Sequence, residues 1–260
     1  MTVVGMAPRF EMGRVAKLTF GSIGRNWVVF GLLGLLLSAI PQALTSWFQA
    51  RMFAAPVPGT FPTGASFLGS SVASLINFAG VMILQAALVH GVISDLNGRK
   101  ATFGECLQTG IRFALPIIAI LILSALGIGL GLVLLIVPGV MLYLAWMVAV
   151  PAEVVERTGV FGAFSRSAEL TRNHRWSLLG LYVIFLILTW ILLGTLLALT
   201  GGFRAAALMM GTRTPVMMVV LAVVQVIQGV IGSAGIAAIY YELRSIKEGI
   251  GPESLASVFD

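Results

Sequence analysis

Long apolar stretches alternate with short polar ones along the whole chain. Six of the apolar stretches contain at least 17 residues, and they occupy positions 27–48, 67–94, 113–137, 139–155, 176–199 and 216–240. An α-helix rises about 1.5 Å per residue and the hydrocarbon core of a bilayer is about 30 Å thick, so about 20 apolar residues cross it. The pattern therefore predicts an all-α membrane protein with six transmembrane helices.

The composition supports this class and excludes a soluble globular domain. Hydrophobic residues make up 58% of the chain, charged residues make up 10%, and the mean hydropathy is +1.02. The single cysteine, Cys106, excludes an internal disulfide, and the two histidines, His90 and His174, lack the spacing of a zinc motif. We predict neither a metal site nor a cofactor.

Lysine and arginine residues are distributed unevenly between the two sides of the predicted membrane domain. Thirteen of the sixteen lie in the N-terminal arm, the second and fourth connections and the C-terminal tail, whereas Arg51, Arg204 and Arg213 lie on the opposite side. The positive-inside rule then places both termini in the cytoplasm, with the protein in the cytoplasmic (inner) membrane. Orientation in the bilayer explains the basic charge, so we predict no nucleic-acid partner.

The connections on the outer side carry few charges. The first contains Pro56, Pro58 and Pro62, and the second is predicted to be a tight turn at 137–139. The third contains an apolar segment, 205–210, which we expect to lie in the outer interface.

Three polar segments have the spacing of amphipathic helices: the arm 1–26 and the segments near 99–112 and 158–172. Each leads into an arginine that is followed directly or after one residue by the aromatic residue that begins a span, at Arg25-Asn26-Trp27, Arg112-Phe113 and Arg175-Trp176. We interpret the domain 27–240 as three hairpins, each preceded by a cytoplasmic interfacial helix, with a possible pseudo-threefold repeat and a cytoplasmic tail at 241–260. The alternative is that arginine and tryptophan simply anchor the edges of the spans, as they do in many membrane proteins.

The repeat predicts a ring of charges at the cytoplasmic ends of the spans. Its members are Arg25, Asp95, Arg112, Glu153, Glu156, Arg175 and Glu242. The four carboxylates lie at the C-terminal ends of predicted helices, where the helix dipole disfavours negative charge, so a neighbouring arginine would stabilise each of them.

Polar residues are few inside the spans. Asn77 and Gln85 in the second span and Gln225 and Gln228 in the sixth predict a polar seam between these two helices, or alternatively hydrogen bonds that hold neighbouring helices together. No charged residue lies in the middle of a span, which argues against an ion- or proton-coupled pump. The glycines at 127, 129 and 131 favour close helix packing.

The segment 137–176 contains a recognisable motif. Its residues are Pro138-Gly139, Pro151, Glu153, Glu156, Ala163, Ser165-Arg166-Ser167, Leu170-Thr171-Arg172 and Trp176, and Tyr240-Tyr241-Glu242-Leu243-Arg244 follows the last span. The motif resembles that of the glycerophosphoryl diester phosphodiesterase membrane-domain family. The resemblance implies a six-span membrane protein of unknown function, with Pro138, Pro151, Glu156, Ser167, Trp176 and Tyr241 as motif positions. The phosphodiesterase reaction itself needs a soluble barrel with a His-Arg-Gly motif, which this sequence does not contain.

Three functions remain open at this point. The first is a non-catalytic membrane component that organises lipids, through anionic head groups, or partner proteins. The second is a carrier or permease for a lipid or small amphipathic molecule, with helices broken at Pro41, Pro116 and Pro151. A remote third is a membrane-embedded enzyme of lipid head groups that uses Glu153 and Glu156 with His90 or His174. We favour the first and predict that the protein is not an enzyme.

Overall fold

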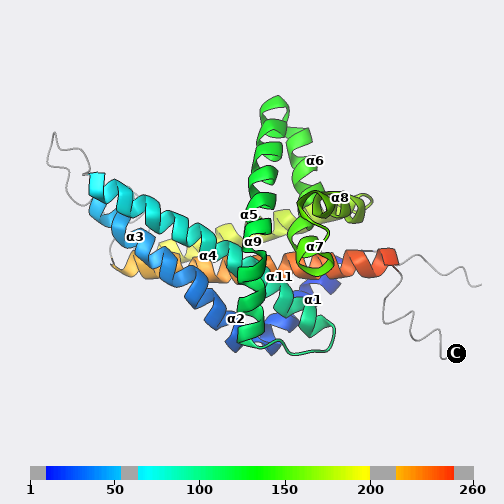
Figure 1. Cartoon of the computed structure of the whole chain (residues 1–260), viewed down its shortest axis with the longest axis horizontal. Helices are drawn as coiled ribbons and strands as arrows, with labels where there is room; N and C mark the ends of the chain where they lie inside the picture. Colours follow the sequence, from blue (N-terminus) through cyan, green and yellow to red (C-terminus); the bar gives the residue numbers. More distant parts are fainter. Residues whose placement is uncertain (1–9, 54–63, 200–214, 249–260) are drawn as a thin grey trace, which may run out of the picture.

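The computed structural model describes residues 10–53, 64–199 and 215–248, and within these ranges the chain forms helices and no strand (Figure 1). The helices are α1 (Met12–Arg25), α2 (Trp27–Gly34), the π-helical turn η1 (Leu35–Ala39), α3 (Ile40–Phe53), α4 (Gly64–Leu96), α5 (Phe103–Leu134), α6 (Ile136–Trp146), α7 (Ala149–Glu156), α8 (Val160–Thr171), α9 (Arg175–Leu199) and α11 (Pro215–Glu248). Six segments are long and apolar enough to cross a membrane: Trp27–Gln49, Phe67–Leu96, Phe103–Leu134, Ile136–Glu156, Arg175–Leu196 and Val219–Glu248. The predicted all-α membrane fold is confirmed.

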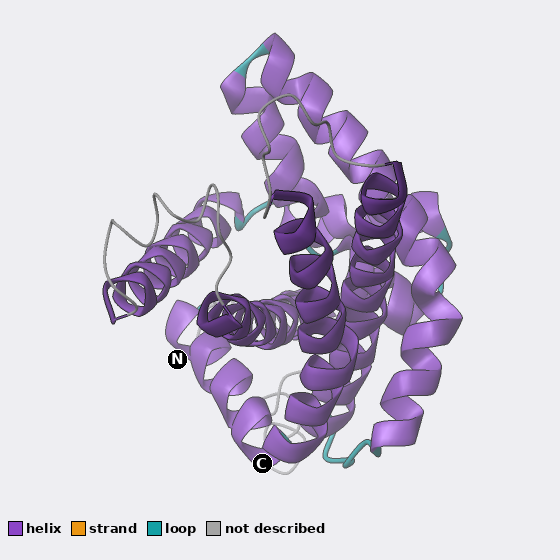
Figure 2. Ribbon diagram, turned by 90° about the vertical axis from the view of Figure 1, so that its left-hand side faces the viewer, coloured by secondary structure: helices purple, strands orange, loops and turns teal. Residues whose placement is uncertain are grey.

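Two antiparallel helix pairs cross each other in this fold. The helices α3 and α4 lie side by side, whereas α5 and α6 form a second pair that rises across the direction in which α11 runs (Figure 1). Figure 2 shows the same helices after a turn of 90°, with the described loops in teal. The core is centred on α4 and α11, where Leu84, Leu88, Ala234 and Tyr240 are almost completely buried.

The helix α9 is the least buried of the six segments. Only 6% of the residues in its most apolar stretch are buried. Large side chains such as Trp176, Ile187 and Trp190 are exposed. In water such a surface would be unfavourable, but in a bilayer it would face the acyl chains.

The proline of the first span is accommodated without breaking the helix. Pro41 follows directly after η1 and Ile40, and it provides no N–H for the carbonyl group of Leu37. At this point α4 approaches so closely that a Cβ atom on Gly80 would lie 2.2 Å from the Leu37 carbonyl oxygen. Pro116 likewise lies inside α5, which continues to Leu134.

Glycines allow α5 and α6 to pack closely. A Cβ atom on Gly139 would lie 2.7 Å from the backbone nitrogen of Leu132, and one on Gly131 would lie 2.9 Å from the Cα atom of Gly139. A Cβ atom on Gly127 would likewise overlap the ring of Trp146, whereas a Cβ atom on Gly129 would meet no atom within 4 Å. Close packing is therefore confirmed for two of the three glycines expected to provide it.

The structure differs from the sequence analysis at two boundaries. The segment 99–112 does not form a separate interfacial helix, because Phe103 begins α5 and the helix continues unbroken into the third span. The turn expected at 137–139 lies earlier, at the extended residue Leu135. Pro138 is in the first turn of α6, where the backbone N–H group that proline lacks would have no acceptor within the helix.

Other boundary predictions are only partly covered by the structure. The segments 12–25 and 160–171 form separate helices, α1 and α8. The first part of the predicted tail, 241–248, is helical and continues α11. The residues Pro56, Pro58 and Pro62, the segments 1–9 and 205–210, and the tail beyond Glu248 lie outside the described residues.

We expect Gly139→Ala to destabilise the α5–α6 pair by about 1–3 kcal/mol, because the added methyl group overlaps the backbone of Leu132. The measurement is the thermal midpoint of the purified protein in detergent. Gly129→Ala is the matched control, since its methyl group meets no atom within 4 Å. Equal midpoints for the two variants would contradict the close packing.

Candidate functional site

The fourth span is broken at Met147 and Val148, between α6 and α7. Pro151 lies in the first turn of α7, and because it has no N–H group it cannot bond to the carbonyl group of Met147 as a continuous helix would require. The break leaves the carbonyl group of Ala145 and the N–H group of Val148 in a buried region, where both need partners.

Ser167 of α8 satisfies both of these groups. Its hydroxyl group donates to the Ala145 oxygen over 2.7 Å and accepts from the Val148 nitrogen over 3.2 Å. One turn later, the hydroxyl group of Thr171 donates to the backbone carbonyl oxygen of Ser167 over 2.9 Å. Both side chains are fully buried, so α8 is fixed to the break by hydrogen bonds as well as by packing.

Arg166, the neighbour of Ser167, joins three helices through an ion network. Its Nε atom lies 2.9 and 3.0 Å from the two carboxylate oxygens of Glu156 at the end of α7, and its Nη2 atom pairs with Glu248 of α11. The buried Tyr240 donates its hydroxyl hydrogen to Glu156 over 2.7 Å. Glu156 is therefore held between a cation and a phenol, in the manner of a structural ion pair.

The network extends along one side of α11. Arg244 donates to Glu248 over 2.8 Å, and the Nζ atom of Lys247 lies 3.0 Å from the carboxylate of Glu169 on α8. The hydrogen bond from Lys247 lowers the pKa of Glu169 below its usual value.

A second ion cluster joins α1 to the ends of α4 and α11. The Nη2 atom of Arg25 lies 2.6 Å from Asp95, and the side-chain amide of Asn26 donates to the same carboxylate over 2.8 Å. Arg14 lies 3.5 Å from the buried Glu242. These contacts place the amphipathic helix α1 against the charged end of the bundle, which we define as the ends of α4, α7 and α11 together with α8.

The predicted ring of charges is formed only in part. The Arg25–Asp95 pair is present. Glu156 instead pairs with Arg166, and Glu242 pairs with Arg14. Neither of these two arginines was a predicted member of the ring. Within the described residues, Arg112 and Arg175 make no ion pair with the four acids.

The remaining ring members have other surroundings. The Cζ atom of Arg112 lies 6.0 Å from the centroid of the Phe113 ring, and Arg157, which was not a predicted member, lies 5.9 Å from the same centroid. The Nε atom of Arg175 is buried without a hydrogen-bond partner in the described part of the chain, and the same holds for the Oε2 atom of the 5%-exposed Glu153. The pairing could not be read from the sequence, because it depends on where α1 and α8 pack.

The residues of the predicted polar seam also differ from the prediction in their hydrogen bonds. The amide group of Asn77 donates over 3.0 Å to Gln42 of the first span rather than to the sixth. Gln85, Gln225 and Gln228 are half-buried and make no side-chain hydrogen bond with the described residues. The observed link between α3 and α4 matches the alternative, hydrogen bonds that hold adjacent helices together.

The other motif positions lie in distinct environments. Pro138 lies in the first turn of α6, Trp176 is 75% exposed at the start of α9, and Tyr241 is half-buried on α11. The chemically interpretable part of the motif is therefore the group formed by Pro151, Glu156 and Ser167.

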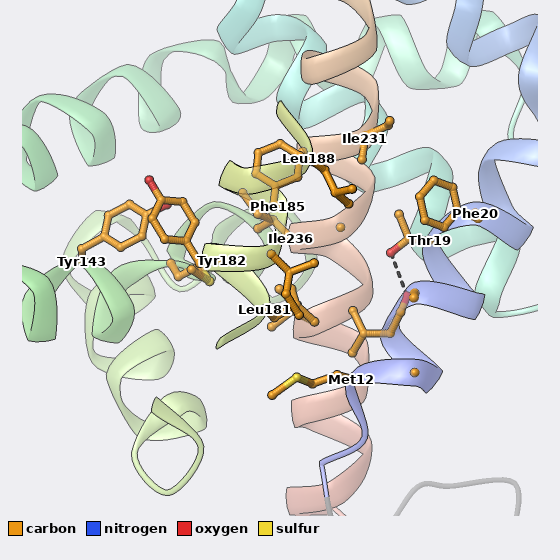
Figure 3. A pocket seen from close by; sticks show the side chains of 18 residues that line it. Met12, Thr19, Phe20, Tyr143, Leu181, Tyr182, Phe185, Leu188, Ile231 and Ile236 are labelled. Carbon is orange, nitrogen blue, oxygen red and sulfur yellow. Dashed lines mark hydrogen bonds between the residues drawn. The ribbon is translucent and has the colours of Figure 1, made fainter. Parts of the chain in front are cut away.

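An apolar pocket of about 340 Å³ lies beside α1, between α6, α9 and α11. Figure 3 shows Tyr143 and Tyr182 at one end of it and Thr19 and Phe20 at the other. The two tyrosine rings are 4.8 Å apart, and the Thr19 hydroxyl group donates to the Val15 carbonyl oxygen within α1. Phe20, Ile184 and Leu188 line the pocket and are more than half exposed, so it opens sideways onto the apolar surface.

The sequence analysis missed this pocket. The amphipathic spacing of α1 was visible, but the gap that this helix leaves against α9 depends on packing. No group of three or more His, Cys, Asp or Glu residues that could hold a metal ion occurs in the described part of the chain.

Comparison with known proteins gives one family. A family model described as a domain of unknown function (DUF7847) matches residues 65–243. No curated protein and no solved structure matches the chain. The resemblance to the glycerophosphoryl diester phosphodiesterase membrane-domain family stays a prediction.

We expect Ser167→Ala to lower the stability of the protein by about 1–3 kcal/mol, because it removes the 3.2 Å hydrogen bond of the buried Val148 N–H group and leaves the Ala145 carbonyl group with only the longer, 3.4 Å bond from Thr171. Thermal midpoints in detergent measure the effect. Ser165→Ala is the matched control on the exposed side of α8 and should change stability by less than about 0.5 kcal/mol. If Ser165→Ala were as costly as Ser167→Ala, the break would not depend on the Ser167 hydroxyl group.

We also expect acid to weaken the contact between Phe10 and His174, whose rings are 5.7 Å apart. Burial lowers the pKa of His174 below its ordinary value of about 6.5. As the pH falls below about 6.5, the unfolded chain therefore takes up this proton before the folded chain does, and the folded state loses stability. The thermal midpoint should fall less between pH 7.5 and 5 in His174→Asn than in the wild type, and equal falls would contradict this assignment.

Proposed function

The chain belongs to the family defined by the domain of unknown function DUF7847, and we propose that this protein is a non-catalytic membrane component that holds lipid acyl chains in its apolar pocket. It would thereby organise lipids in the cytoplasmic membrane, with its charged end on the cytoplasmic side. The pocket between α1, α6, α9 and α11 is the single observation that carries this proposal.

The chemistry of the pocket supports an acyl chain rather than a polar ligand. The lining residues are almost all aliphatic or aromatic, and the Thr19 hydroxyl group is already bonded within α1. The volume of about 340 Å³ is in the range of small-molecule sites. The free energy of an apolar chain changes little when the chain moves from the bilayer into such a pocket. Shape and packing would therefore determine which acyl chains the pocket selects.

The position of the pocket supports a lipid that enters from the bilayer. Its exposed rim includes Phe20 of α1 and Ile184 and Leu188 of α9. The helix α1 is held by Arg14–Glu242 and Arg25–Asp95 at the charged end. With this end in the cytoplasm, as the distribution of lysine and arginine suggests, the pocket would open into the inner leaflet.

A carrier for a lipid or small amphipathic molecule is the second candidate. The break at Pro151 and the sideways opening favour it, because carriers use interrupted helices around their sites. A role as an enzyme is less favoured, because Glu156 is engaged by Arg166 and Tyr240. A partner protein that binds the exposed face of α9 would be compatible with either a component or a carrier.

We expect Gly235→Phe to fill the pocket and displace a bound chain. A Cβ atom at Gly235 meets no atom within 4 Å, so the added ring can enter the pocket without disturbing α11. The probe is a phospholipid with a photoreactive diazirine in one acyl chain, reconstituted with the protein in nanodiscs. The cross-linked residues are identified by mass spectrometry.

The wild type should give cross-links to the pocket residues of α9 and α11, and Gly235→Phe should reduce them at least fivefold. Gly194→Phe is the matched control, because Gly194 is exposed on α9, does not line the pocket and also has open space at its Cβ position. Uniform labelling of the outer surface that Gly235→Phe leaves unchanged would contradict the proposal. Transfer of a labelled lipid between leaflets by the wild type, but not by Gly235→Phe, would favour the carrier.

A further inference from the structure

A second cavity, of about 240 Å³, lies at the connection between α4 and α5 and has a different chemistry. Its polar lining comes from two helices and the loop between them: His90 and Ser94 of α4, Arg99 and Lys100 of the loop, and Gln108 and Thr109 of α5. None of these residues lines the apolar pocket. The two cavities can therefore be tested independently.

The backbone of the connection is fixed at both ends. The N–H group of Arg99 donates to the backbone carbonyl oxygen of Ser94 over 2.9 Å, and that of Gly98 donates to the backbone carbonyl oxygen of Asp95 over 3.0 Å. With Gly98 at a φ of +77°, this is the Schellman arrangement at a helix C-terminus. Three residues later, Thr102 and Glu105 form a capping box that starts α5. The backbone of Arg99 and Lys100 is thus held between two helix caps, which do not use the side chains of these residues.

The charges and donors in this cavity have few partners in the protein. Within the described residues, Arg99 and Lys100 make no ion pair, and Ser94, Gln108 and Thr109 make no side-chain hydrogen bond. Glu105 is the one carboxylate of the lining, and its Oε2 atom already accepts the Thr102 N–H over 2.8 Å. The cavity therefore combines an excess of positive charge with unused hydrogen-bond donors.

This combination matches a phosphate group. Arginine binds phosphate oxygens through its planar set of donors and lysine binds them as a point charge, and hydroxyl and amide groups can bond to the remaining oxygens. The cavity lies where two apolar segments, Phe67–Leu96 and Phe103–Leu134, end and begin. A lipid phosphate would lie at that level of the bilayer.

We propose that the cavity at the α4–α5 connection is a phosphate-binding site in which Arg99 and Lys100 supply the charge and Ser94, Gln108 and Thr109 supply hydrogen bonds. The phosphate can belong to a lipid head group or to a free phosphate ion. The chemistry of recognition is the same in both cases.

Binding to the purified full chain in a zwitterionic detergent separates the two sources. One titration uses dioctanoyl phosphatidylglycerol, and a second uses inorganic phosphate. Binding of the lipid alone, weakened by loss of Arg99 and Lys100, identifies a head-group site, whereas binding of both identifies a site for phosphate itself. Lipid binding that does not depend on these two residues would belong to the apolar pocket and would overturn the proposal. Binding of neither overturns the proposal.

The variant R99Q/K100Q removes both cations and should weaken binding at least tenfold. Lys17→Gln with Arg172→Gln is the matched control, since it removes two exposed cations outside the cavity, and it should change the affinity less than twofold. An equal loss of affinity in the control would show that the probes are attracted to positive charge in general, and would overturn the proposed site. The variant S94A/T109A keeps the net charge and tests the site if R99Q/K100Q does not fold: binding should weaken about threefold, and unchanged binding would contradict the assignment.

Discussion

A helix that breaks inside an apolar region must find hydrogen-bond partners for the backbone groups that the break exposes, and the charged end of this protein depends on how that requirement is met. The break between α6 and α7 is caused by Pro151, and the hydroxyl group of Ser167 satisfies both the Ala145 carbonyl group and the Val148 N–H group. Without these bonds α8 would be held by packing, by the 3.4 Å bond from Thr171 to Ala145 and by ion pairs at its surface. The Ser167 hydroxyl group is therefore the contact that fixes the amphipathic helix α8 directly to the break.

The position of α8 in turn determines the ion network. Arg166 is adjacent to Ser167, and once Ser167 is fixed at the break, Arg166 reaches Glu156 of α7 and Glu248 of α11. Partly buried ion pairs of this kind stabilise a structure only when both partners have further hydrogen bonds, and Tyr240 provides one for Glu156. The end of α11 is thus tied to the fourth span, and α1 is added to the same end through Arg14 and Arg25.

The two cavities differ because their surroundings differ. The apolar pocket is bordered by α9, which packs loosely and exposes large side chains, so a gap between α9 and α1 can open sideways. The polar cavity is bordered by two capped helix ends, which leave the backbone satisfied and the side chains of Arg99 and Lys100 unpaired within the described part. Together they would suit the two chemically distinct parts of a phospholipid, although they lie at separate places in the fold.

The sequence by itself determined the class of the fold. Six long apolar stretches and a mean hydropathy of +1.02 require helices, because only internally bonded backbone is stable in an apolar environment. It also located α1 and α8, whose amphipathic spacing is a local property. It misplaced the turn before α6, because a proline is as favourable in the first turn of a helix as in a loop, and local sequence cannot distinguish the two. Only the tertiary structure decided the pairing of Arg166 with Glu156, the link from Asn77 to Gln42 and the existence of both cavities, since each depends on the distance between side chains of different helices.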